Sequence, residues 1–154
     1  MTMKGSWVAL GLVAVLLAGC AGSSTPVPQR QQAQVAVESP VVGPRWQLIL
    51  IGTDEHWAGN EPAWFEVVPN GEALHLTGND GCNRLNGQVS LDDGNRIRIE
   101  NLASTRMACA NLAEAQRVTT LLENAYRFLI DKDRLVFFGR DSRVLGGFQR
   151  TSAR

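Results

Sequence analysis

The sequence has no excess of charge and no cluster of basic residues. Its 15 lysines and arginines balance 15 aspartates and glutamates. Proteins that bind nucleic acids gather positive charge on one face or along one segment, where it neutralises phosphates. We therefore expect no nucleic-acid partner.

The patterns of common catalytic and metal sites are also missing. The sequence contains no glycine-rich phosphate loop with a lysine, no His-Glu-x-x-His and no Gly-x-Ser-x-Gly. Its three cysteines form no Cys-x-x-Cys pair of the kind found in zinc sites. The segment Asp92-Asp93-Gly94-Asn95 lacks the downstream glutamate of a calcium loop and is typical of a turn. We expect no metal, no cofactor and no enzymatic activity.

The longest apolar run is too short to cross a membrane as a helix. It extends from Trp7 to Gly19, whereas a membrane helix needs roughly 20 residues. With Lys4 before it and small residues at its end, the run is typical of a signal peptide over residues 1–19. A plain secretory signal is one interpretation of this segment.

The end of this run, Leu17-Ala18-Gly19-Cys20, resembles a bacterial lipobox. That resemblance implies that Cys20 receives a diacylglyceryl group and becomes the acylated N-terminus, which anchors the protein to a membrane. Ala21 follows the cysteine, where an aspartate would favour the inner membrane of a Gram-negative cell. The expected location is the cell envelope, at the outer membrane facing the periplasm.

Residues 20–44 are predicted to form a flexible, lipid-anchored tether. They contain prolines and a cluster of glutamines, which do not support long regular elements or a core. A flexible coil of this length spans on the order of 25–30 Å. The valines at 35, 37, 41 and 42 leave open an extra strand within residues 35–44.

From Arg45 to the end of the chain, short runs of alternating apolar residues predict one mainly β domain, residues 45–154. We expect a small antiparallel curled sheet or barrel of seven to eight strands with one packed helix. Asn111 is the predicted N-cap of that helix, and Asn70-Gly71 predicts a tight hairpin turn. The predicted apolar stripe of the helix consists of Leu112, Ala115, Val118, Leu122 and Ala125.

Cys82 and Cys109 are expected to pair, because two thiols in one small domain usually do so in an oxidising compartment. Closing such a loop stabilises the fold by about 3–4 kcal/mol in the loop-entropy model. Two free buried thiols and a metal site remain alternatives.

Two motifs at this spacing resemble the META domain family, also called HslJ-like. They are Gly81-Cys82-Asn83, preceded by Gly78, and Thr105-Arg106-Met107-Ala108-Cys109, followed by a helix. The resemblance covers roughly residues 45–150. It implies a small β-rich domain with a packed helix, often found in lipoproteins and associated with heat shock, antibiotic tolerance, motility or virulence-linked export. It implies no catalytic residues.

Several polar or aromatic residues are candidates for a recognition loop, and each also has a structural interpretation. Asn79, Asn83 and Arg84 surround Cys82 and either form a recognition lip or hold the backbone. Trp57 is either an exposed contact or a packing residue, and Arg106 either binds an anion or holds loop carbonyls.

We expect a non-catalytic binding or stress-protection module of the envelope, held at the membrane by its lipid. An accessory lipoprotein that supports assembly of an outer-membrane complex, with an envelope protein as partner, is the alternative. A thiol or hydrolytic enzyme is a remote third, because it requires a free Cys82 thiolate, with His75 as a candidate base.

The lipobox generates a direct test. Replacing the thiol in Cys20→Ser should leave an unlipidated, mislocalised precursor, because the acyl group attaches to that sulfur. Membrane fractionation and the intact mass measure both effects. An unchanged mass and distribution would contradict the lipid anchor.

Overall fold

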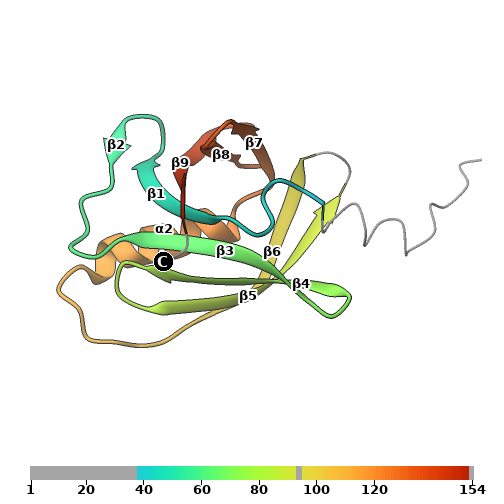
Figure 1. Cartoon of the computed structure of the whole chain (residues 1–154). Coiled ribbons are helices and arrows are strands. Elements are labelled where there is room, and N and C mark those ends of the chain that lie inside the picture. Colours follow the sequence, from blue (N-terminus) through green and yellow to red (C-terminus); the bar gives the residue numbers. More distant parts are fainter. Residues whose placement is uncertain (1–37, 93–94, 153–154) are drawn as a thin grey trace, which may run out of the picture.

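The computed structural model describes residues 38–92 and 95–152. Within these ranges nine strands form one antiparallel, curled sheet with one helix packed against it (Figure 1). The elements are β1 (Arg45–Ile51), β2 (Glu55–His56), β3 (Ala63–Asn70), β4 (Ala73–Asp80), β5 (Arg84–Asp92), β6 (Arg96–Ser104), α2 (Leu112–Glu123), β7 (Arg127–Asp131), β8 (Arg134–Phe138) and β9 (Val144–Thr151).

The predicted fold class is confirmed: the chain is mainly β, with a curled antiparallel sheet and a packed helix. The described residues contain one strand more than the upper predicted number. The additional strand is β2, which is two residues long and fully exposed. Its polar sequence shows no apolar alternation, so the pattern could not predict it.

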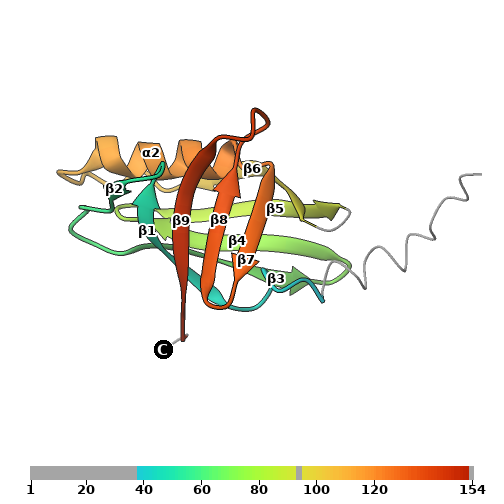
Figure 2. The same cartoon turned by 90° about the horizontal axis from the view of Figure 1, so that it is seen from above.

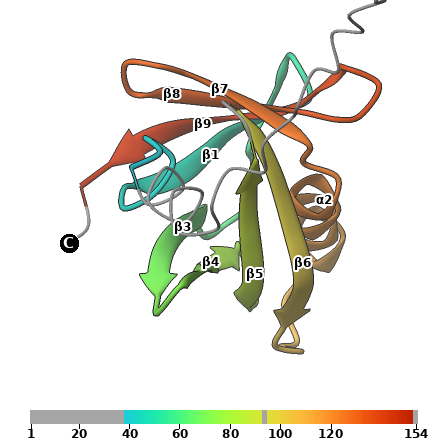
Figure 3. The same ribbon diagram turned by 90° about the vertical axis from the view of Figure 1, so that its right-hand side faces the viewer.

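The sheet is ring-like because β1 has two long neighbours. It pairs with β3 through Arg45–Gln47 and with β9 from Arg45 to Ile51. After Gln47 the strand leaves β3, and a register shift between Leu48 and Leu50 marks a bulge, a feature that bends a strand. Figure 3 shows the resulting curl, with β1 and β9 side by side.

The ring is weakest between β6 and β7, which pair only through Arg96 and Arg127. The helix α2 packs against β6 and β4 and lies beside this gap (Figures 2 and 3). Its buried residues are Ala115, Val118, Leu121 and Leu122. No helix in the described part of the chain is long and apolar enough to cross a membrane.

Leu112 does not belong to the buried stripe of α2, contrary to the prediction. It is 49% exposed, whereas Ala115, Val118, Leu122 and Ala125 are buried as predicted. Leu112 begins the helix, and this end projects beyond the strands beneath it (Figure 2). Helical periodicity identifies a face, but it does not show where the partner surface ends.

An aromatic cluster occupies the interior of the ring. Phe65, Phe137 and Phe148 come from β3, β8 and β9, and their ring centroids lie 5.1–5.5 Å apart. Such offset and edge-to-face pairs stabilise a core beyond their buried area. Trp46 is fully buried as well, and its indole N–H donates to the carbonyl oxygen of Val41 at 3.1 Å.

The packed part of the chain begins before Arg45, so the predicted tether boundary lies inside it. Val41 is fully buried, and the Gly43 N–H donates to the Val67 carbonyl oxygen at 2.9 Å. Val42 and Val67 form an isolated parallel bridge, which takes the place of the possible extra strand. The predicted signal peptide, Cys20 and most of the predicted tether lie outside the described residues.

The two ends of the molecule carry different features. The described chain begins at one end, near the hairpin between β3 and β4 (Figures 1 and 2). In that hairpin Gly71 alone adopts a positive φ of 65°, while Asn70 pairs with Ala73 instead of entering the turn as predicted. The β4–β5 turn, the loop before α2 and the start of α2 lie at the opposite end.

Adjacent glycines in β9 provide a matched test of the packing between α2 and the sheet. A Cβ atom at Gly146 would lie 2.8 Å from the Leu50 carbonyl oxygen and 2.5 Å from Leu121 Cδ1, whereas one at Gly147 would approach no closer than 3.7 Å. Gly146→Ala should lower the free energy of unfolding by about 1–3 kcal/mol. Gly147→Ala should leave it unchanged or slightly higher. Urea unfolding of both variants measures this, and equal effects would contradict the packing.

Candidate functional site

The β4–β5 turn is organised by a buried carboxylate. Asp80 is 1% exposed, because the inward positions of β4 end on it after Leu74, Leu76 and Gly78. Its Oδ1 accepts hydrogen bonds from the backbone N–H groups of Cys82 (2.9 Å) and Asn83 (2.5 Å). Bonds of this kind to an ionised acceptor are stronger than neutral ones and offset the cost of burying the charge.

The same carboxylate links the turn to the helix. Asp80 Oδ2 accepts from the Thr119 hydroxyl of α2 at 3.3 Å and from Asn83 Nδ2 at 3.4 Å. The sequence reasoning did not single out Asp80, because Asn79-Asp80-Gly81 is typical of a turn. Its inward position in the alternation of β4 is the signal that could have identified it.

Asn83 joins the turn to the loop that precedes α2. It is 8% exposed, and its Oδ1 accepts from the Met107 N–H at 2.8 Å and the Thr105 hydroxyl at 3.4 Å. The Arg84 backbone N–H also donates to the Thr105 hydroxyl, at 3.0 Å. The Asn83 side chain is therefore a structural bridge between the two motifs.

Cys82 and Cys109 form a disulfide between these two segments, with a Cα–Cα distance of 6.0 Å. Neither sulfur is then a thiol, so the structure provides no thiolate nucleophile at this position. His75 lies in the middle of β4, opposite Val68 and Gln88, and so is not beside Cys82.

Trp57 packs over the turn. Its indole N–H donates to the Glu61 carbonyl oxygen at 3.0 Å. Gly81 has a φ of +94°, and a Cβ atom there would lie 2.5 Å from a carbon of the Trp57 ring. Of the two interpretations of Trp57, these contacts favour packing over exposed recognition.

Asn111 and Arg106 do not take the structural roles considered for them. The Asn111 side chain makes no capping bond to α2 and donates instead to the Gly81 carbonyl oxygen at 3.3 Å. Arg106 is exposed, and its side chain forms no hydrogen bond with the described residues, so it does not hold loop carbonyls. The Arg84 side chain is exposed in the same way.

A hollow of about 680 Å³ lies beside this turn, and we call it the amide pocket. Gln47, Trp64 and Asn79 line it from β1, β3 and β4, together with Arg45, Glu61 and Thr151. The Arg45 guanidinium lies 3.8 Å from the Trp64 ring centroid, and its Nε donates to Glu66 Oε1 at 2.6 Å. Of the predicted recognition residues, Asn79 contributes its side chain; sequence reasoning missed Gln47 and Trp64.

The amide of Gln47 has no side-chain hydrogen bond to any described residue, although it lines the pocket. Asn79 uses its Oδ1 to accept from the Gly81 N–H at 2.7 Å, which leaves its NH₂ group as a donor. The pocket therefore combines an aromatic ring, amide groups and a guanidinium. These groups keep polar atoms that are not hydrogen-bonded within the β4–β5 turn.

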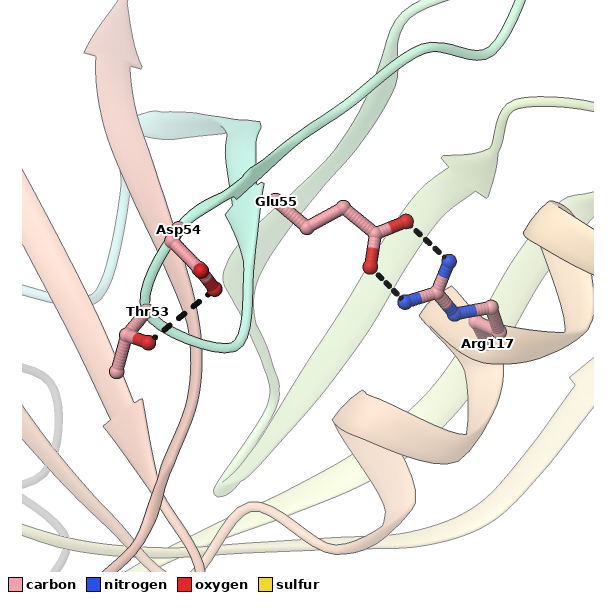
Figure 4. A network of polar contacts seen from close by, with 4 residues as sticks. All are labelled: Thr53, Asp54, Glu55 and Arg117. Atoms are coloured by element: carbon pink, nitrogen blue, oxygen red, sulfur yellow. Dashed lines mark hydrogen bonds and ion pairs between the residues drawn. The ribbon is translucent and has the colours of Figure 1, made fainter.

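A second hollow of about 890 Å³ lies between α2 and the β8–β9 turn. Leu121, Leu145 and Tyr126 are part of its lining, and the Arg140 guanidinium lies 4.5 Å from the Tyr126 ring centroid. Arg117, also in the lining, donates two hydrogen bonds of 2.5 Å to the carboxylate of Glu55 in β2 (Figure 4). This exposed pair connects β2 to α2.

The Glu55–Arg117 pair changes the ionisation of both groups. The hydrogen bonds from Arg117 lower the pKa of Glu55, and the reciprocal bonds raise the pKa of Arg117.

Among the described residues, no group of three or more His, Cys, Asp or Glu side chains could hold a metal ion.

A family model described as the META domain matches residues 39–152. The chain belongs to the META domain family. The match begins before Arg45, in agreement with the burial of Val41 in the same packed unit. A comparison with curated proteins gave no match.

Solved structures share the fold of this META domain at low sequence identity. An NMR structure of a protein from Burkholderia xenovorans is 19% identical, with a TM-score of 0.60 over 92% of this chain and 100% of that one. A second NMR structure is 20% identical, with a TM-score of 0.51 over 80% and 95% of the two chains. The crystal structure of a DUF4847 family protein from Bacteroides vulgatus is 12% identical, with a TM-score of 0.53 over 77% and 99%.

The Asp80 network generates a stability prediction. Asp80→Ala should lower the free energy of unfolding by about 1–3 kcal/mol, because the Cys82 and Asn83 N–H groups lose their acceptor. Asp80→Asn retains one carbonyl oxygen as an acceptor and should cost less. Urea unfolding measures both, and Asp80→Ala without effect would contradict the role of the carboxylate.

The ion pair in Figure 4 predicts a pH effect. The pKa of Glu55 lies below its usual 4.5. The pair therefore stabilises the fold above the unfolded-state pKa, and this contribution is lost as the pH falls through the folded-state pKa. The effect on stability is small because the pair is exposed. In an NMR titration, Arg117→Gln should return the Glu55 pKa to its usual value, whereas Arg98→Gln, on the same hollow, should not. A pKa that does not respond to Arg117→Gln would contradict the pair.

Proposed function

We propose that this META protein is a lipid-anchored, non-catalytic binding module of the bacterial cell envelope, with a role in stress protection. The lipobox-like sequence around Cys20 and the proline-containing segment after it support the anchor. The outer membrane, facing the periplasm, is the proposed location.

The observation that carries the binding role is the amide pocket. The polar groups of the Gly-Cys-Asn turn are used within the fold: Asp80 and Asn83 are buried and bonded. Gln47 and the Asn79 NH₂ group, in contrast, line a hollow beside Trp64. Pockets that orient a ligand combine an apolar surface with a few such polar groups.

The disulfide supports a non-catalytic role over the thiol-enzyme alternative. A thiol enzyme requires a thiolate, and the Cys82 sulfur is bonded to Cys109. His75, the candidate base, lies in mid-strand on β4, away from this sulfur.

An assembly accessory with an envelope protein as partner is the second candidate function. Met107 and Leu112 favour it, because they are 56% and 49% exposed beside the disulfide loop. Exposed apolar side chains of this size contribute to protein interfaces when they cluster.

Site-specific crosslinking in living cells tests the binding role. A photoreactive residue at position 47 of the full-length chain places the probe in the amide pocket, and one at position 116 places it on α2 in the lining of the second hollow as a control. We expect adducts in the membrane fraction from position 47 that are absent from position 116. Mass spectrometry then identifies the adduct. The absence of adducts at position 47, or the same adducts at both positions, would contradict the proposal.

A further inference from the structure

We propose that the outer face of the sheet binds an extended β-linked oligosaccharide of the type found in cell walls. The binding surface is one row of side chains across five neighbouring strands: Gln149, Gln47, Trp64, Asn79 and Arg84. We call it the cross-strand row. This inference rests on the proposed binding function and names the chemistry of its ligand.

The strand register places these side chains next to one another around the outside of the curled sheet. Gln47 lies opposite both Gln149 and Trp64, Trp64 opposite Asn79, and Asn79 opposite Arg84. Residues directly opposite in a sheet point to the same face, and neighbouring strands lie about 4.8 Å apart, so the row extends over roughly 19 Å. The rings of an extended β-linked oligosaccharide repeat at a similar distance, so successive sugars can lie over successive strands.

Trp64 is the central side chain of the row and its aromatic platform. The Arg45 guanidinium covers one face of the ring at 3.8 Å and is itself held by Glu66, so the indole is fixed before a ligand arrives and a sugar would stack on its other face. The ring is half-buried, and it also lines the amide pocket. Pyranose rings present faces of C–H groups that stack on indole, and an aromatic group fixed in place loses little entropy on binding.

The neighbours of Trp64 suit the edges of a sugar. The amide of Gln47 offers both a donor and an acceptor, and Asn79 offers its NH₂ group, because its oxygen accepts from Gly81. Hydroxyl and acetamide groups need both kinds of partner. The exposed Arg84 at one end of the row can pair with a carboxylate substituent of a wall-type sugar.

The next row on the same face favours a polysaccharide over a protein partner. Arg45, Glu66, Thr77 and Asn86 lie opposite one another across β1, β3, β4 and β5. The cores of protein interfaces are enriched in aromatic residues and Arg but depleted of Glu, Lys and Asp, and this row includes Glu66. A surface with two polar rows and one tryptophan instead resembles a sugar-binding platform in its chemistry.

The position of the row also suits a polymer located away from the membrane. Asn79 and Arg84 flank the β4–β5 turn, which lies at the end of the molecule opposite the start of the described chain (Figures 1 and 2). If the chain is anchored through Cys20, the row includes the end of the domain opposite the point where the described chain begins.

The test measures binding of defined sugars to the full-length protein by calorimetry. The β-1,4-linked tetramer of N-acetylglucosamine should bind at least about tenfold more tightly than the monomer, because it occupies several positions of the row. The α-linked maltotetraose, whose chain curves, should bind more weakly than the tetramer. Binding to isolated cell-wall sacculi, measured by sedimentation, would identify the wall as the source, and binding to the tetramer alone would indicate a soluble glycan.

Variants inside and outside the cross-strand row test whether the tetramer binds there. Trp64→Ala should reduce tetramer affinity at least about tenfold and Gln47→Ala several-fold, while Trp64→Phe keeps a stacking surface and should lose less. Gln116→Ala and Tyr126→Ala, both in the lining of the second hollow, are the controls and should bind as the unmodified protein does. Circular dichroism confirms that each variant is folded.

Two results would overturn this inference. One is the absence of saturable tetramer binding by the unmodified protein, and the other is tetramer binding that neither Trp64→Ala nor Gln47→Ala weakens. A protein adduct at position 47 without tetramer binding would overturn the saccharide inference and leave the binding function intact. The absence of both adduct and tetramer binding would contradict the two proposals together.

Discussion

The structure depends on the first strand being shared between two neighbours. Residues Arg45–Gln47 pair with β3 on one side and with β9 on the other, and this double pairing closes the curl of the sheet. Inside, closure brings Phe65 of β3 against Phe148 of β9. Outside, it makes Gln149, Gln47 and Trp64 neighbours. The core residues and the cross-strand row thus lie on opposite faces of the same paired strands, since alternate residues of a strand point to opposite sides.

The Gly-Cys-Asn turn has a structural role, which was one of the two interpretations that its polar composition left open. Burying Asp80 costs free energy, and two backbone N–H groups, an amide and a hydroxyl offset that cost by donating to its carboxylate. Asn83 and the disulfide then tie the loop before α2 to the same turn. Because these groups are used within the fold, the side chains available to a ligand are those on the adjacent outer face.

Short-range patterns predicted most of the sheet from the sequence. The strands β7, β8 and β9 follow most directly from the sequence, because strong apolar alternation there coincides with clear turns. The second half of β6 carries no such signal, because most of its residues are exposed and pairing with β5 rather than burial holds it. The valines at 35, 37, 41 and 42 left open an extra strand, but their short pattern did not show that Val41 is fully buried in the core.

The candidate site was harder to predict than the strands. The polar loop around Cys82 is recognisable in the sequence, and Asn79 does line the pocket. Gln47 and Trp64 look like ordinary outward positions of two separate strands, and only their register makes them adjacent. The same limit applies to Asp80 and Thr119, which are distant in the chain and meet where the helix crosses the end of β4.

The sequence by itself determined the class of the fold, the approximate limits of most strands, the helix and the family resemblance. These properties depend on periodicity, turn residues and short motifs, all of which act over a few neighbouring positions. Only the tertiary structure decided the sharing of β1, the structural use of the Gly-Cys-Asn turn and the alignment of the cross-strand row. Each of these requires residues far apart in the chain to meet, and their meeting is set by strand register and helix packing, which local patterns do not encode.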